Sequence, residues 1–241
     1  MRTINFYILI ILMSILTVTS CKKEDLNTIE ETSIEFNPDI IYGSVEDIDK
    51  NVYKTVTICG QTWMAENLRT THYQNGDQIE NIINNTEWEN LKSGAYSLFE
   101  NDTTNKHPYG ALYNWYAVND SRKIAPEGWH VATDEEWTTL MECLGGEEIA
   151  GAKMKEIGII HWTSTTDEIT NESGFTSLPS SYRFPFGGFG DLGESCSFWA
   201  STEKNDSIAW NRGIGAEDLY CGRGAYLKEY GFSIRCVKDN N

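Results

Sequence analysis

The chain has 241 residues, with 36 acidic and 19 basic side chains and a formal net charge of −17 at pH 7. This acidity argues against nucleic acid as a partner, because phosphate binding needs a positive surface. After residue 20, no segment comes near the roughly eighteen consecutive apolar residues of a membrane-spanning helix.

Residues 1–20 have the pattern of a bacterial signal peptide. Arg2 provides a positive start, residues 4–16 are almost wholly apolar, and small residues precede Cys21. A cysteine at the cleavage point predicts a lipoprotein in which Cys21 carries a diacylglycerol; an ordinary secretory signal with a chance cysteine is the alternative. Two or three acyl chains of the palmitate type, at about 0.8 kcal/mol per buried methylene, would hold the protein on a membrane.

The polar residues 21–41 are predicted to be a flexible, acidic tether between the lipid and a folded domain. A lysine and acidic residues directly after Cys21 also resemble the surface-export signal of Bacteroidetes lipoproteins. We therefore expect a lipid-anchored protein of the outer membrane, exposed at the cell surface, with the periplasmic face as the alternative.

The first half of the domain predicts strands and loops. Residues 45–47, 52–58 and 62–65 have the alternation and turn residues of short strands. Residues 69–107 are rich in Asn, Thr, Gly and Asp, which predicts long loops. Residues 109–118 predict a short helix from the spacing of their apolar side chains.

The clearest local pattern predicts a helix over residues 133–146. Thr133 and Glu136 form a capping box, and Gly145 and Gly146 end the helix. Beyond residue 160, glycines and serines separate short aromatic runs that predict strands. Helices followed by an irregular sheet indicate an α+β domain over residues 42–238.

Five cysteines remain besides Cys21, so at least one is free or bridges two chains. We expect one disulfide among the last three and buried thiols elsewhere, although sequence alone leaves the connectivity open. The five are Cys59, Cys143, Cys196, Cys221 and Cys236.

Several motifs together resemble the Fibrobacter succinogenes major paralogous domain family. The opening, residues 52–58 followed by 61–68, is similar to the start of that domain. Six further landmarks follow in the family's order, at residues 109–115, 126–131, 133–137, 174–179, 198–203 and 231–237.

The resemblance implies a C-type-lectin-like fold related to sulfatase-modifying enzymes, with two short helices, small irregular antiparallel sheets and long loops. In that fold the first and last strands pair, so residues 52–58 should lie beside residues 232–237. Many members carry a cysteine where this chain has Ala125, which rules out a disulfide from that position to Cys236. The family occurs in exported bacterial proteins, and its biochemical function is largely undefined.

Catalytic and metal chemistry find little support in the residues. A formylglycine-generating activity needs a redox cysteine pair or a copper site, and Cys221 and Cys236 are more consistent with a structural role. The calcium-binding motifs of lectins are absent, and the four histidines have no zinc-ligand spacing. His130, inside a family landmark, is expected to be a packed structural residue. We therefore expect no catalytic residue, metal or cofactor.

A stretch that interleaves aromatic residues with arginines predicts binding. Aromatic rings stack on sugars, and Tyr and Arg are favoured at protein interfaces. The alternative is that the aromatic rings fill the core and the arginines cover it. The candidate ligand-binding residues are Trp210, Arg212, Tyr220, Arg223 and Tyr226.

The sequence thus favours a non-catalytic module that binds a glycan or a surface protein through loops between residues 180 and 230. A sulfatase-modifying or glycan-processing enzyme, and a structural component of a surface assembly, are the alternatives. The first would show a deep pocket with converging ionisable groups, and the second a large exposed apolar patch.

Overall fold

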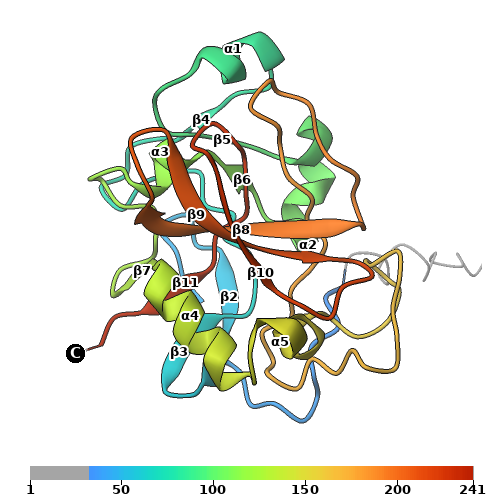
Figure 1. The fold of residues 1–241 in the computed structure, drawn as a ribbon. Coiled ribbons are helices and arrows are strands. Elements are labelled where there is room, and N and C mark those ends of the chain that lie inside the picture. The colour runs from blue at the N-terminus through green and yellow to red at the C-terminus, as the bar shows by residue number, and fades with distance from the viewer. Residues whose placement is uncertain (1–32, 241) are drawn as a thin grey trace, which may run out of the picture.

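A five-stranded antiparallel sheet joins the beginning of the domain to its end in the computed structural model, which describes residues 33–240 (Figure 1). Its strand order is β1-β2-β3-β11-β7. The strands are β1 (Gly43–Glu46), β2 (Val52–Ile58), β3 (Gln61–Met64), β11 (Cys236–Lys238) and β7 (Trp129–Val131).

The predicted pairing of the first and last strands is wrong by one strand. Cys59 and Gly60 both have positive φ, which folds β3 back onto β2 in a tight turn. β3 therefore takes the place beside the last strand, and Val237 pairs with Trp63.

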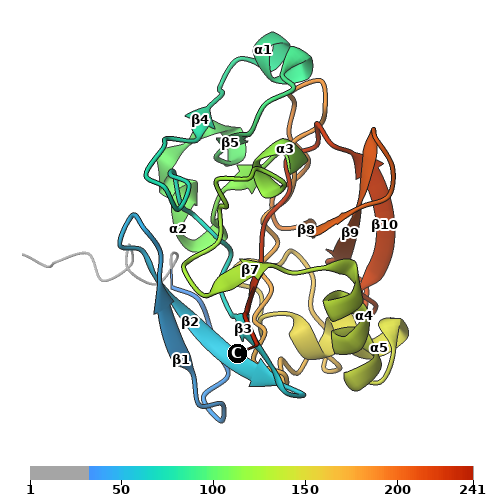
Figure 2. The ribbon, with the colours of Figure 1, turned by 90° about the vertical axis from the view of Figure 1, so that its left-hand side faces the viewer.

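A second, three-stranded antiparallel sheet has the order β10-β9-β8, and its strands are β8 (Ser195–Glu203), β9 (Ile208–Gly215) and β10 (Gly222–Leu227). In Figure 2, β1 and β2 lie at the left edge of the domain, and β9 and β10 lie at the right edge. A third, small sheet consists of β4 (Glu80–Asn81), β5 (Ala95–Ser97) and β6 (Leu112–Tyr113).

Helix α4 (Asp134–Cys143) confirms the predicted capping box. The Thr133 hydroxyl accepts a hydrogen bond from the Glu136 amide (3.2 Å), and the Glu136 carboxylate accepts one from the Thr133 amide (2.8 Å). Helix α5 (Glu147–Met154) was not predicted. The other helices are short: α1 (Asn85–Asn90), α2 (Lys106–Tyr109), α3 (Trp115–Val118) and the 3₁₀ turns Phe99–Asn101 and Thr103–Asn105.

The single helix predicted over residues 109–118 is wrong. Gly110 ends α2 with φ of 81°, where it packs so closely on Asn67 that an added Cβ would lie 2.6 Å from the Asn67 Cβ. The chain then forms β6, and the side chain of Asn114 caps α3 by accepting from the Ala117 amide (3.1 Å).

Three fully buried cations hold the long loops by donating to backbone carbonyls. Lys155 bonds the carbonyls of Gly215, Ala216 and Asp218 at 2.6–3.2 Å. Within residues 33–240, no carboxylate forms a salt bridge with any of the three, so carbonyl dipoles replace counterions. They are Lys155, Arg183 and Arg235.

Packing begins before residue 42, where the tether was expected to end. Phe36 and Ile40 lie against the core, and the Glu35 amide donates to the Glu156 carboxylate (2.7 Å). Cys21 and the predicted signal peptide lie outside the described residues. Among the residues the structure describes, no helix is long and apolar enough to cross a membrane.

The α+β architecture, with short helices and small, mostly antiparallel sheets, is confirmed (Figures 1 and 2). The C-type-lectin-like relationship stays a prediction.

Candidate functional site

The β8–β9–β10 sheet divides the five predicted binding residues between its two faces. Side chains alternate along a strand, and Arg223 is the register partner of Arg212. Trp210, Arg212 and Arg223 therefore share the face toward helix α4, whereas Tyr226 projects from the opposite face.

The residues on the α4 side make contacts that hold the sheet to the helices. Arg212 is 1% exposed, forms an ion pair with Glu147 and donates to the Thr138 hydroxyl (3.0 Å). Arg223 donates two hydrogen bonds to the Asp134 carboxylate (2.9 and 2.5 Å), and its guanidinium lies 3.4 Å from the centre of the Trp210 ring. These side chains already have partners, which suits a structural role.

The opposite face of the same sheet carries a groove of about 500 Å³. Its floor consists of glycines and small polar residues, which occupy alternate strand positions that face the groove. The floor residues are Ser195, Ser197, Asn211, Gly213, Gly215, Gly222 and Gly224.

Two of the predicted tyrosines cover the glycines of β10. A Cβ added to Gly222 would lie 2.4 Å from the ring of Tyr220, and one added to Gly224 would lie 2.7 Å from the ring of Tyr226. The glycines thus allow both rings to lie close to the backbone. Tyr220 and Tyr226 remain 43% and 41% exposed, so both rings are available to a ligand.

An aromatic wall closes one side of the groove. It combines Tyr226 with residues from a loop near residue 184 and from the segment before β11. Tyr226 lies 5.2 Å from Tyr230 and 5.4 Å from Phe232, measured between ring centres. The wall residues are Tyr182, Phe184, Tyr226, Tyr230 and Phe232.

The wall tyrosines can offer neutral hydroxyl groups. Burial raises the pKa of Tyr182 and of Tyr230. Both hydroxyls are therefore protonated at neutral pH and able to donate or accept a hydrogen bond.

One buried polar side chain faces the groove without a partner. Asn211 is 3% exposed, and its side-chain oxygen makes no hydrogen bond within residues 33–240. A buried amide without a partner costs free energy, so its presence calls for an explanation. Two acidic residues, Glu148 and Asp218, also line the groove.

Sequence reasoning missed most of the groove. Tyr182, Phe184, Tyr230 and Phe232 were not among the candidate residues, because they come from segments that only the fold brings together. The missed local pattern was the pair of Gly-x-Gly repeats in neighbouring strands, at residues 213–215 and 222–224. Such repeats clear one face of a sheet.

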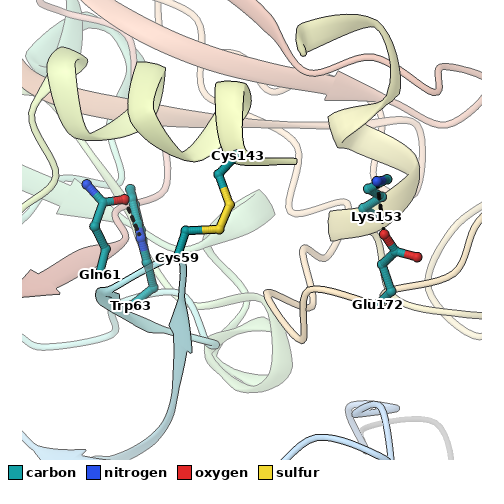
Figure 3. Close-up of a disulfide and its surroundings, with 6 residues drawn as sticks. All are labelled: Cys59, Gln61, Trp63, Cys143, Lys153 and Glu172. Atoms are coloured by element: carbon teal, nitrogen blue, oxygen red, sulfur yellow. Dashed lines mark hydrogen bonds and ion pairs between the residues drawn. A yellow bond between two sulfur atoms is a disulfide. The ribbon is translucent and has the colours of Figure 1, made fainter. Parts of the chain in front are cut away.

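The cysteine pairing differs from the expected one. Cys59 and Cys143 form a disulfide between the turn after β2 and the end of α4, with Cα atoms 6.4 Å apart (Figure 3). Cys196, Cys221 and Cys236 are buried free thiols. The two cysteines pair because the fold brings the β2–β3 turn next to the end of α4. The spacing of cysteines in the sequence does not reveal this contact.

The free thiols are poorly suited to redox or nucleophilic chemistry. Burial raises the pKa of all three, and that of Cys196 to about 12. A thiol must ionise to react, so these thiols are inert in the folded state. Among the described residues, no cluster of three or more His, Cys, Asp or Glu side chains could hold a metal ion.

The sequence model of the Fibrobacter succinogenes major domain matches residues 56–238, a range that contains the whole groove. No curated protein and no solved structure shows significant similarity to the chain. On the extent of the family match, the chain belongs to the Fibrobacter succinogenes major domain family.

Proposed function

We propose that this protein is an exported lipoprotein whose domain binds a glycan, without catalysis, in the groove of the β8–β9–β10 sheet. The observation that carries the proposal is the combination of a floor of glycines and small polar residues with an aromatic wall. The volume of about 500 Å³ lies within the usual range for small-ligand sites.

The chemistry of the groove suits a sugar. A pyranose ring has an apolar face that stacks on tyrosine and phenylalanine, and hydroxyl groups around its edge. The floor supplies matching polar groups, namely the hydroxyls of Ser195 and Ser197 and the amide of Asn211. A surface-protein partner remains the second candidate, since exposed tyrosines such as Tyr226 also serve as anchors at interfaces.

The non-catalytic part of the proposal rests on the side chains available. The buried thiols have raised pKa values, and the cations nearest the groove are engaged in structural contacts. A glycan that binds should therefore be recovered uncleaved after long incubation with the protein. Release of shorter products would point to a hydrolase that uses Glu148 and Asp218.

The test is a glycan array probed with the lipid-free protein, residues 22–241, with and without calcium. Tyr226→Ala should abolish reproducible binding. The matched control is Leu227→Ala, because Leu227 is the next residue of β10, is similarly exposed (45% against 41%) and projects from the other face. Equal loss in both variants, or in neither, would contradict the proposed site.

A second variant fills the groove without removing a ring. A Cβ added to Gly213 meets nothing closer than 3.7 Å, so Gly213→Val should fold normally. Its side chain would stand on the floor and occupy ligand space. Unchanged binding by a folded Gly213→Val protein would argue that the ligand lies elsewhere.

We also propose that Cys21 anchors the protein in the outer membrane, with the domain at the cell surface or, alternatively, on the periplasmic face. Labelling cells with a palmitate analogue should mark the wild-type protein and leave Cys21→Ser unmarked. Digestion of the domain by protease added to intact cells would place it outside, and protection would place it in the periplasm.

A further inference from the structure

We propose that the groove selects saccharides built from uncharged sugar rings and rejects acidic ones, and that Asn211 is its specificity-determining residue. This inference rests on the proposed glycan-binding function and adds the chemical class of the ligand. It follows from the charges that line the groove and from Asn211, which among the described lining residues alone has a buried side-chain atom without a hydrogen-bond partner.

The groove offers no free cation to an acidic sugar. Arg223 is its only lining arginine among the described residues, and the Nε and Nη2 atoms of that guanidinium bond both carboxylate oxygens of Asp134, which neutralises its charge. Its face lies on Trp210. A uronate, sialate or sulfate would therefore lose hydration without gaining a counterion.

Carboxylates add direct repulsion. Glu148 and Asp218 both line the groove, and Glu148 forms no ion pair within residues 33–240. The Asp218 carboxylate lies close to the floor, since a Cβ added to Gly215 would be 2.3 Å from its Oδ2 atom. Like charges placed against a competitor are a common means of specificity.

Asn211 supplies a positive selection for a hydroxyl group. Its side chain lies between β8 and β10 on the floor, and a Cβ added to Gly224 would be 2.6 Å from its oxygen. A sugar hydroxyl can both donate and accept, so it satisfies the amide in either orientation. A site that pairs a buried polar group with a ligand hydroxyl discriminates strongly against ligands that lack it.

A binding role and a purely structural role of Asn211 predict different effects of the same substitution. If Asn211 only filled space, Asn211→Leu would keep the volume and leave binding unchanged. If its amide awaits a ligand, Asn211→Leu removes an unpaired buried group, so the melting temperature should hold or rise while affinity falls at least tenfold.

The experiment uses titration calorimetry of residues 22–241 with oligosaccharide pairs that share one backbone. Oligogalacturonate and its full methyl ester form one such pair, and neutral oligomers of glucose, mannose, xylose and N-acetylglucosamine complete the set. We expect binding to at least one neutral oligomer, with any acidic counterpart at least tenfold weaker. At low salt, Glu148→Lys should reduce the difference in affinity between the neutral and the acidic oligomers.

The outcomes distinguish this inference from the proposed function. Equal or tighter binding of acidic oligomers that Tyr226→Ala abolishes would overturn the charge selection and leave the groove as the binding site. Full affinity in Asn211→Leu would overturn the role of Asn211. A Tyr226-dependent protein partner with no saccharide binding would overturn the inference and the choice of a glycan as ligand, and would leave the groove as the binding site. No response to any groove variant would overturn the groove as well.

Discussion

The side chains of Arg235 and Asn67 form a buried hydrogen bond of 2.7 Å, from the arginine Nε to the amide oxygen, across 168 positions of the sequence. The same guanidinium donates to the carbonyls of Met64, Phe175 and Thr176 at 2.8–2.9 Å. Arg235 thus joins the first landmark of the family to the last and to the loop at residue 175. Burial lowers its pKa to about 9, which leaves it charged at neutral pH.

Replacement of Arg235 should be severely destabilising. Arg235→Leu leaves buried carbonyls and the Asn67 amide without donors, and we expect the free energy of unfolding to fall by about 3 kcal/mol or more. Arg235→Lys should rescue little, because an ammonium cannot reproduce the planar fork. Urea unfolding followed by tryptophan fluorescence measures the change.

Arg122 provides the matched control for this prediction. Its guanidinium also bonds a side-chain oxygen at 2.8 Å, that of Asp120, but it is 38% exposed. Arg122→Leu should therefore cost no more than about 1 kcal/mol. Equal losses in the two variants would show that burial of Arg235 contributes nothing.

Sequence patterns correctly predicted those elements whose formation depends on interactions between residues close together in the chain. The capping box of α4 and the strand over residues 52–58 depend on neighbours within a few positions, and both form as predicted. The groove could not be predicted in this way. Its floor requires the register that sets Gly213 opposite Gly222, and its wall requires residues 182 and 230 to meet beside β10.

The Cys59–Cys143 disulfide and the burial of the other cysteines predict how many thiols react. In residues 22–241, we expect no thiol to react with an aromatic disulfide reagent in the folded state, three after unfolding, and five after unfolding with reduction. The first number follows from the burial of Cys196, Cys221 and Cys236, and the last adds Cys59 and Cys143. A single reactive thiol after unfolding would indicate a second disulfide.

Removing the disulfide should also lower stability. It links residues separated by 84 positions. The loop-entropy relation assigns about 4.5 kcal/mol to a closure of that length, with measured values of about 2–5 kcal/mol. The double variant Cys59→Ala/Cys143→Ala should unfold at lower urea concentration by a corresponding amount. Cys236→Ala is a useful comparison, because Cys236 forms no disulfide and any loss of stability in that variant comes from packing alone.

At Gly151, close packing and helix propensity predict opposite effects of an alanine substitution on stability. It lies within α5, where alanine is normally preferred by about 1 kcal/mol. An added Cβ would, however, lie 2.5 Å from the carbonyl oxygen of Tyr220. We expect Gly151→Ala to lower the melting temperature, whereas Gly213→Ala, with 3.7 Å of clearance, should not. Stabilisation by Gly151→Ala would show that α5 can shift away from residue 220.

His130, expected from the sequence to be structural, connects β7 to α4 and to the end of the chain. Its Nε2 contacts the Glu136 carboxylate at 2.8 Å, and its Nδ1 contacts Asp239 at 2.6 Å. The hydrogen bond to Glu136, supported by Asp239 and opposed by partial burial, raises the pKa of His130 to about 9. The imidazolium is therefore the main form in the folded protein at neutral pH.

A raised folded-state pKa fixes the direction of the pH dependence. In the unfolded chain the imidazole titrates near pH 6.5, so its contribution to stability is fully present below about pH 6.5 and is lost as the pH rises through about 9. Because the side chain is 38% exposed, screening limits the contribution to about 1 kcal/mol. His130→Gln should therefore lower the melting temperature at pH 6 by a few degrees and have no effect at pH 9.5. Glu135→Gln, on the same turn of α4 but without contact to His130, is the control and should follow the wild-type dependence of melting temperature on pH. If His130→Gln instead lowers the melting temperature by the same amount at pH 6 and pH 9.5, its effect comes from packing and not from charge.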